Sequence, residues 1–142
     1  MSVEVRSAIP ADESRCLELV SALTGESVSP GWAVTFQALL SGDRGEVLVA
    51  DESGLILGVA TVSCNLAIRY AGEYAQLEEL IVDPVARGKN VGGLLVEAAV
   101  ERARQRGCVE FGLYLMEETE KNRAFYERYG FKFIGSEMRQ RL

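Results

Sequence analysis

The sequence predicts an α/β domain in which a mixed, mainly antiparallel central sheet is flanked by helices. Two observations predict this class. The spacing of apolar residues changes from helical to alternating after Gly42. A long amphipathic helix then separates two strands, which makes them a parallel pair joined by a crossover. The order of elements reads β-α-α-β-β-β-α-β-α-β, and residues 1–142 contain no repeat or linker, so we expect one domain.

The N-terminal third predicts one strand and two helices. Val3–Ala8 alternates between apolar and polar residues, as a strand does. Asp12 can begin a helix that ends at Gly25. A second, shorter helix is expected over Trp32–Leu40, with Gly42 as its terminator.

The middle of the chain predicts an antiparallel hairpin and a further strand. Val47–Ala50 and Leu55–Leu66 are rich in β-branched residues and are joined by the turn Asp51–Gly54. Tyr74–Val82 is the next strand, and the Asp-Pro pair at residues 83–84 ends it.

The C-terminal half predicts a long helix, a parallel strand and a closing helix and strand. Val91–Ala103 carries an apolar stripe at helical spacing, and Gly107 follows as a C-cap. Val109–Leu115 alternates as a buried strand. We expect a last helix over Thr119–Tyr129, capped by its threonine, and a final strand over Phe131–Leu142.

Charge and histidine content exclude several classes of function. The net charge is −6 and the basic residues are not clustered, which argues against a nucleic-acid partner. The chain contains no histidine, which removes Ser-His and Cys-His pairs and histidine metal ligands. We therefore expect no metal site, and any acid–base chemistry must use other side chains or water.

Cysteine usage and hydropathy indicate a cytoplasmic protein. Cys16, Cys64 and Cys108 are odd in number and lie in separate apolar runs, so they predict reduced core thiols. No stretch approaches the roughly 18 apolar residues of a membrane span, and the N-terminus does not resemble a secretion signal. We expect no membrane partner.

The segment between the strand at 74–82 and the long helix predicts an anion site. Small residues and free backbone N–H groups at a helix N-terminus suit a pyrophosphate. Asn90 is one of the few residue types besides glycine that tolerate a left-handed conformation, and Arg87 and Lys89 add positive charge. The segment fits neither the P-loop nor the dinucleotide fingerprint, because Asn90 replaces the middle glycine of the latter.

Two motifs resemble those of the GNAT superfamily of acetyl-CoA-dependent N-acetyltransferases. Residues 82–84 (Val-Asp-Pro) and 87–92 (Arg-Gly-Lys-Asn-Val-Gly) resemble its Arg/Gln-x-x-Gly-x-Gly/Ala motif, with asparagine at the first glycine. Residues 122–131 resemble its Asn-x-x-Ala-x-x-Phe-Tyr-x-x-x-Gly-Phe helix, with the asparagine nearer the Phe-Tyr pair. Within the superfamily the chain looks most like the small-molecule branch that includes aminoalkylphosphonate N-acetyltransferases. The resemblance covers nearly the whole chain.

The resemblance implies transfer of an acetyl group from acetyl-CoA to a primary amine by a homodimeric enzyme of GNAT-like fold. It implies a direct attack by the amine, with a backbone N–H near Ile81 or Val82 holding the oxyanion. Tyr126 is then the general acid for the thiolate, since a phenol with a pKa of about 10 can protonate it. The implied cofactor-binding residues are Ile81, Val82, Arg87, Gly88, Lys89, Asn90, Val91, Gly92, Gly93 and Asn122.

A base is needed because an alkyl amine has a pKa of about 10.4 and is protonated at neutral pH. Glu78 and Glu79, in the strand before the cofactor loop, are the candidates, acting directly or through water. Strand alternation predicts that they point to opposite faces of the sheet, so only one meets the substrate. We favour Glu79, with Glu73 as a third candidate. Cys64 and Cys108 lack a base partner and are poor acyl carriers.

The acceptor and two alternative functions stay open at this stage. Acidity of the chain favours a cationic substrate, whereas Arg69 would favour an anionic one. One alternative is a sensor or interaction module that binds acetyl-CoA without catalysis, if both glutamates are locked in ion pairs. Another is a nucleotide-binding protein. The expected substrate contacts come from Trp32, Phe36, Asn65, Arg69, Tyr70 and Tyr74.

Overall fold

A five-stranded sheet with strand order β1-β2-β3-β4-β5 organises the chain. The computed structural model describes residues 2–142. Its strands are β1 (Glu4–Ser7), β2 (Gly45–Glu52), β3 (Leu55–Ala67), β4 (Gly72–Val82) and β5 (Phe111–Leu113). Its α-helices are α1 (Glu13–Thr24), α2 (Pro30–Leu40), α3 (Val91–Arg106) and α4 (Arg123–Glu127). No helix within residues 2–142 combines the length and the apolar character that crossing a membrane requires.

The pairing confirms a mixed, mainly antiparallel sheet. Strands β1 to β4 are antiparallel neighbours, and β5 runs parallel to β4 after the crossover through α3. The parallel pairing is short, because only Ala75–Leu77 of β4 faces Phe111–Leu113 of β5. Residues 79–82 of β4 therefore pair with β3 on one side and with no strand of the described chain on the other.

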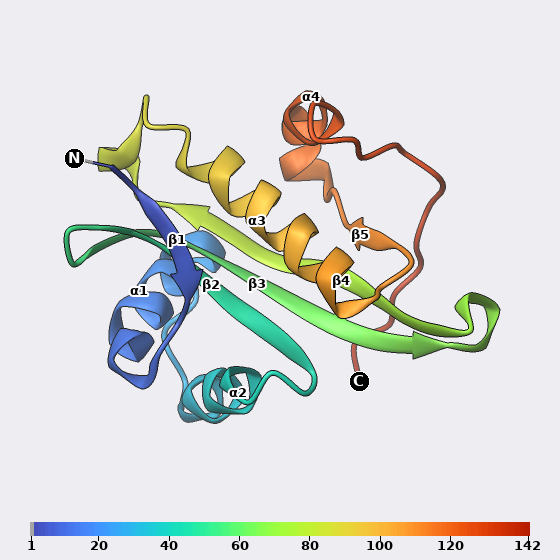
Figure 1. Ribbon diagram of the computed structural model, residues 1–142, viewed down its shortest axis with the longest axis horizontal. Helices are drawn as coiled ribbons and strands as arrows, with labels where there is room; N and C mark the ends of the chain where they lie inside the picture. The colour runs from blue at the N-terminus through green and yellow to red at the C-terminus, as the bar shows by residue number, and fades with distance from the viewer. Residues whose placement is uncertain (1) are drawn as a thin grey trace.

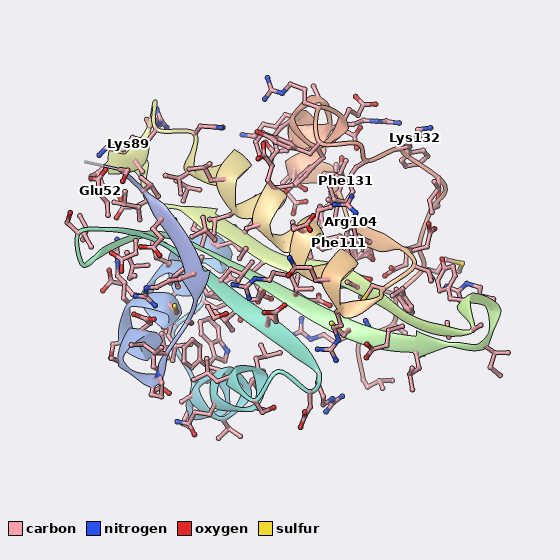
Figure 2. The ribbon with its side chains drawn as sticks, in the orientation of Figure 1. Glu52, Lys89, Arg104, Phe111, Phe131 and Lys132 are labelled. Carbon is pink, nitrogen blue, oxygen red and sulfur yellow. The ribbon has the colours of Figure 1, made fainter. Side chains whose placement is uncertain are left out.

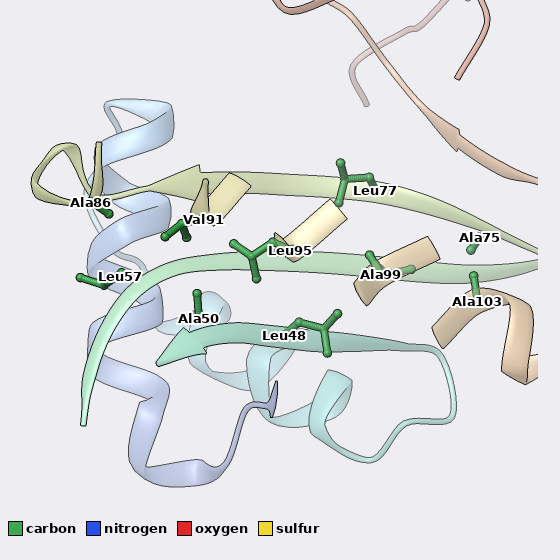
Figure 3. Close-up of a cluster of buried hydrophobic side chains, with 12 residues drawn as sticks. Leu48, Ala50, Leu57, Ala75, Leu77, Ala86, Val91, Leu95, Ala99 and Ala103 are labelled. Carbon is green, nitrogen blue, oxygen red and sulfur yellow. The ribbon is translucent and has the colours of Figure 1, made fainter. Parts of the chain in front are cut away.

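Helices cover both faces of the sheet (Figure 1). The apolar stripe of α3 packs on one face, where Val91, Leu95 and Ala99 meet side chains of β2 and β3 such as Leu48 and Leu57 (Figure 3). The other face is covered by α1 and α2, whose buried residues include Cys16, Leu19 and Phe36. Burial of the β2 and β3 side chains on both faces explains their near-continuous apolar sequence.

The expected helix ends are confirmed where glycine supplies a left-handed residue. Gly25 follows α1 with φ of 75°, and its N–H bonds to Ser21 O. Gly107 follows α3 with φ of 91°. Both conformations are open to glycine at little cost, and they satisfy carbonyl groups that the helix leaves without partners.

The C-terminal expectations are wrong in three places. The strand expected over Val109–Leu115 is limited to Phe111–Leu113, and it is half-buried where full burial was expected. Thr119 does not begin the last α-helix, because Glu117–Asn122 forms a 3-10 helix and α4 starts only at Arg123. Thr119 Oγ1 instead accepts a hydrogen bond from Met116 N at 2.9 Å, which caps the 3-10 helix. The predicted strand over Phe131–Leu142 does not form, and this segment passes outside β5 without joining the sheet (Figure 1).

The reason for the missing strand lies in its side chains. Phe131 is half-buried and its ring lies 5.7 Å from that of Phe111. Beyond it, Ile134 is 90% exposed and Met138 is 96% exposed, so the apolar side chains of the segment have no face on which to pack. A strand gains stability from such side-chain packing, and Ile134 and Met138 obtain almost none.

Candidate active site

The loop between β4 and α3 presents a helix N-terminus with free backbone donors. Asp83 accepts a hydrogen bond from Val85 N at 3.0 Å and caps a 3-10 turn. Asn90 then adopts the left-handed conformation, with φ of 54°, and α3 begins at the next residue. The first bond within α3 runs from Leu94 N to Asn90 O at 3.0 Å, so the three preceding N–H groups lie ahead of the helical ladder. This is the geometry that binds phosphate groups.

The glycines after Asn90 have different surroundings. A Cβ added at Gly92 would lie 3.5 Å from Phe125 Cζ and 3.7 Å from Val82 Cγ2, which are ordinary contacts. A Cβ added at Gly93 would instead collide with the hydroxyl of Tyr129 and with the Asn90 side chain. Gly93 thus lets Tyr129, which follows α4, approach the start of α3 closely.

The two cations of the loop are not equivalent. Lys89 Nζ forms an ion pair with Glu52 at 2.8 Å, which neutralises part of its charge (Figure 2). Arg87 is exposed and has no ion-pair partner within residues 2–142. Its guanidinium is therefore the charge of this loop that remains available to an anionic ligand.

A β-bulge in β4 changes the expected arrangement of the two glutamates. Thr61 of β3 pairs with Glu79, whereas the next residue, Val62, pairs with Leu77, so Glu78 is the extra residue. The prediction that Glu78 and Glu79 point to opposite faces is therefore wrong. Each carboxylate is hydrogen-bonded to a hydroxyl of β3, Glu78 to Ser63 at 2.6 Å and Glu79 to Thr61. These hydroxyls stand two residues apart, so both carboxylates lie on the face that α1 and α2 cover.

Glu79 has the surroundings of a base. Burial raises its pKa, the hydrogen bond from Thr61 opposes that rise, and the nearby charge of Glu78 adds to it. Glu78 itself is exposed. Glu73 is held by Arg106 at 2.9 Å, and that hydrogen bond lowers the pKa of the carboxyl group. Of the three carboxylates, Glu79 therefore has the environment that best suits proton transfer near neutral pH.

The free edge of β4 supplies backbone donors beside these glutamates. Asp83 N bonds to Leu57 O of β3 at 2.8 Å, and hydrogen-bonded pairs alternate along an antiparallel ladder. The N–H of Ile81 is thereby directed toward β3. The N–H groups of Leu80 and Val82 point to the opposite edge of β4, beyond the residues that pair with β5. Leu80 was not expected in this role, since strand register rather than residue type places its N–H.

A cavity of about 250 Å³ lies between α1, α2 and the sheet. Among residues 2–142, Glu79 is the only charged residue that lines it. Trp32 and Phe36, both expected to contact the substrate, are in its wall. The full lining consists of Cys16, Leu17, Val20, Thr24, Trp32, Thr35, Phe36, Leu39, Val47, Val59, Thr61 and Glu79.

The other expected substrate residues lie elsewhere. Arg69 stacks over the rings of Tyr70 and Tyr74, at 4.5 and 5.7 Å from their centroids. These residues and Asn65 belong to the far end of the β3–β4 hairpin and do not line the cavity. No pattern in the sequence distinguishes them from Trp32, because an aromatic residue near an expected sheet fits both places.

Tyr126 lies on α4 and does not line the Glu79 cavity. It borders a separate groove between β5, α4 and the C-terminal segment. Its ring contacts those of Phe125 and Phe131, and burial raises its pKa. Asn122, at the start of α4, is exposed and makes no side-chain capping bond. The structure thus brings Glu79, Trp32 and Phe36 together and leaves Tyr126 in a different hollow.

The cysteines are poor nucleophiles in this structure. All three are free. Burial raises the pKa of Cys16 to about 12 and that of Cys64 to about 11, and it raises the pKa of Cys108 as well. Little thiolate is present at neutral pH, which disfavours a covalent acyl-enzyme.

Residues 13–131 match the model of a protein family described as the acetyltransferase (GNAT) family. An uncharacterized N-acetyltransferase of Methanocaldococcus jannaschii is 31% identical over 68% of this chain, and the match spans 43% of that relative. Glucosamine 6-phosphate N-acetyltransferase of Trypanosoma brucei brucei is 27% identical over 98% of this chain and 95% of its own length.

Solved structures share the fold over its whole length. Glucosamine-6-phosphate N-acetyltransferase from Arabidopsis thaliana aligns with a TM-score of 0.81 and 26% identity, covering 99% of both chains. The small-molecule branch that the chain resembles is also represented, by an aminoalkylphosphonate N-acetyltransferase of Salmonella typhimurium. That relative is 29% identical over 59% of this chain and 54% of its own length.

Proposed function

The chain belongs to the GNAT acetyltransferase family and is an acetyl-transferring enzyme, and on that premise we propose that it acetylates a primary amine with acetyl-CoA as cosubstrate. The observation that carries the proposal is the position of Glu79, a half-buried carboxylate in an apolar cavity. Glu79 lies on β4, whose unpaired edge leads to the loop before α3.

We assign the diphosphate of coenzyme A to the start of α3. The N–H groups of Val91, Gly92 and Gly93 precede the helical ladder, and the left-handed Asn90 shapes the turn before them. Arg87 adds a positive charge that has no ion-pair partner in the described part of the chain. Free amides, small residues and a cation at a helix N-terminus are the donor set that a diphosphate requires.

The protein groups act on the proton and on the developing charge. Glu79 removes a proton from the bound ammonium group, and its raised pKa makes it a stronger base than an exposed glutamate. The neutral amine attacks the thioester carbonyl carbon, and the N–H groups of Leu80 and Val82 are placed to stabilise the oxyanion. As the tetrahedral adduct collapses, its nitrogen gives up a second proton to water and the C–S bond breaks. The leaving thiolate of coenzyme A takes up a proton, for which Tyr126 remains our candidate donor.

The non-catalytic alternative depended on both glutamates being locked in ion pairs. In the described part of the chain, Glu78 and Glu79 have hydroxyl partners, Ser63 and Thr61, and neither is joined to a cation. A hydroxyl can rotate away when a substrate arrives, so this arrangement favours the enzyme over an acetyl-CoA sensor.

We further propose that the enzyme works as a homodimer in the cytoplasm. The segment 131–142 carries exposed apolar side chains, among them Phe133, Ile134 and Met138, beside the unpaired edge of β5. A second copy would cover such a surface. The three free thiols suit a reducing compartment. Light scattering on the purified protein gives the mass in solution, and a monomer at micromolar concentration would refute the dimer.

Two measurements on the same preparation test the enzymatic proposal. Calorimetry with coenzyme A reports binding, and release of free thiol from acetyl-CoA in the presence of an amine panel reports transfer, with mass spectrometry to identify the acetylated amine. We expect binding and amine-dependent thiol release. A folded protein that binds no coenzyme A would overturn the proposal at its cofactor site.

A further inference from the structure

The side chains that line the Glu79 cavity indicate which class of amine it can bind. We propose that the acceptor is a primary amine on an apolar body, such as an aralkylamine or a branched alkylamine, and not a phosphorylated or polyhydroxylated amine. This inference rests on the acetyl transfer proposed above and concerns the same site. It departs from the substrate named for the Arabidopsis thaliana and Trypanosoma brucei relatives, which is glucosamine 6-phosphate.

The charges around the cavity do not suit a phosphate. Neither lysine nor arginine lines it within the described residues. The one charged group, Glu79, would repel an anion and attract an ammonium ion. A phosphate that entered would lose its hydration without gaining a cation, and burial of an unpaired charge is strongly unfavourable.

The hydroxyl groups of the wall already have partners. Thr61 donates to Glu79, Thr35 Oγ1 donates to Gly31 O at 3.0 Å, and Thr24 Oγ1 accepts from Glu26 N at 3.1 Å. A sugar brings several hydroxyls that each need a partner when water is removed. Two of the three wall threonines already donate their hydroxyl proton within the protein, so the cavity offers the several hydroxyls of a sugar few free partners.

The remaining wall is apolar and is set on two helices at helical spacing. Trp32 and Phe36 stand one turn apart on α2, and Leu17 and Val20 share a face of α1, so the four side chains face the space between the helices. An ammonium at Glu79 would leave the body of the amine among these side chains. The exposed Thr24 and Thr35 mark where the cavity reaches solvent.

Tryptophan fluorescence reports on this cavity, because Trp32 lines it and is the only tryptophan of the chain. Titration with phenylethylamine, followed by tryptophan emission in the absence of acetyl-CoA, measures occupancy without requiring any chemistry. We expect a saturable change with phenylethylamine and none with glucosamine 6-phosphate or spermidine at the same concentrations.

Thiol release from acetyl-CoA then measures the preference among acceptors. In the series ethylamine, butylamine, phenylethylamine, kcat/KM should rise by at least about tenfold at each step. One additional methylene in an apolar pocket already changes kcat/KM by roughly this factor. Glucosamine 6-phosphate and spermidine should be poorer acceptors than phenylethylamine by at least the same factor.

A matched pair of variants tests the location. Thr35→Lys places a cation at the mouth of the cavity and should lower kcat/KM for phenylethylamine by about tenfold. Val34→Lys places the same cation on the neighbouring residue of α2, which is 68% exposed and does not line the cavity, and should have no such effect. Circular dichroism and coenzyme A affinity confirm that both variants are folded.

The outcomes separate this inference from the proposed function. A preference for glucosamine 6-phosphate or spermidine would overturn the apolar acceptor while leaving acetyl transfer intact. An unchanged Trp32 signal with every apolar amine would overturn it as well. If phenylethylamine changes the Trp32 signal but no amine is acetylated, the ligand class of the cavity is supported and acetyl transfer fails.

Discussion

Thr61 contacts Glu79 at two points, accepting a hydrogen bond from its backbone N–H at 3.1 Å and donating its own hydroxyl to the carboxylate. The second bond stabilises the ionised carboxylate and so opposes the rise in pKa that burial causes. Thr61→Val removes this bond with little change in shape. We expect the acid limb of the kcat/KM profile to move to higher pH, as measured by initial rates across the pH range.

The control for this prediction is Thr61→Ser, which keeps a hydroxyl and should keep the wild-type profile. Ser63→Ala is a second control, because Ser63 contacts the exposed Glu78 instead. If Thr61→Val left the pH profile unchanged while the protein remained active, Glu79 would not be the group whose ionisation limits the reaction.

Glu79 should reduce the stability of the folded protein as the pH rises. Its pKa in the fold lies above the ordinary value of 4.5, so the folded state holds this proton more tightly than the unfolded state does. The resulting stabilisation is complete below pH 4.5 and is lost as the pH rises through the folded-state pKa. Glu79→Gln cannot lose a proton, so its free energy of unfolding relative to wild type should increase between about pH 4 and about pH 7.

Urea denaturation at the two pH values measures this difference, with the exposed Glu78→Gln as the matched control. The same Glu79→Gln variant should lose about 10²- to 10⁴-fold in kcat/KM, the range in which a general base contributes. If Glu79→Gln became more stable than wild type as the pH rises but kept full activity, Glu79 would be buried for a reason other than catalysis.

Arg87 should contribute to the affinity for coenzyme A. It is exposed and has no ion-pair partner in residues 2–142, whereas Lys89 is paired with Glu52. A charge-assisted hydrogen bond contributes about 1.5–3 kcal/mol, so Arg87→Glu should weaken binding by at least about 10- to 100-fold in calorimetry. Arg104→Glu, at the far end of α3, reverses an equal charge and should leave the affinity unchanged.

The two glycines at the start of α3 should respond differently to alanine. Gly92→Ala meets only ordinary contacts, so it should be neutral or stabilising by about 0.5–1 kcal/mol in chemical denaturation. Gly93→Ala would collide with Tyr129 and Asn90 and should destabilise the protein by about 1–3 kcal/mol. Adding Tyr129→Phe to Gly93→Ala removes one of the colliding atoms and should recover part of the loss. Equal effects of the two alanines would contradict this packing.

Much of the site's framework could be predicted from local patterns. The apolar stripe of residues 91–103 and the terminator Gly107 placed α3 correctly, and the tolerance of asparagine for positive φ anticipated the conformation of Asn90. These features depend on residues close together in the sequence, and local sterics decide them.

Features that depend on register or on distant partners could not be predicted. Alternation placed Glu78 and Glu79 on opposite faces, but the bulge is defined only by how β4 pairs with β3. The N–H of Leu80 is available because β5 ends early, which no property of leucine indicates. Apolar residues in 131–142 suggested a strand, yet a strand also depends on side-chain packing, which Ile134 and Met138 lack.

Tyr126 gives the sharpest test of how far the family resemblance extends to the chemistry. Burial raises its pKa, so the phenol keeps its proton at neutral pH, as a general acid must. It lies outside the Glu79 cavity, however, and Tyr126→Phe preserves the ring that packs against Phe131. If Tyr126 protonates the leaving thiolate, Tyr126→Phe should lower kcat by about 10²-fold or more at unchanged affinity for coenzyme A, whereas Tyr129→Phe should leave kcat intact. A kcat within about twofold of wild type would assign this protonation to water and Tyr126 to packing.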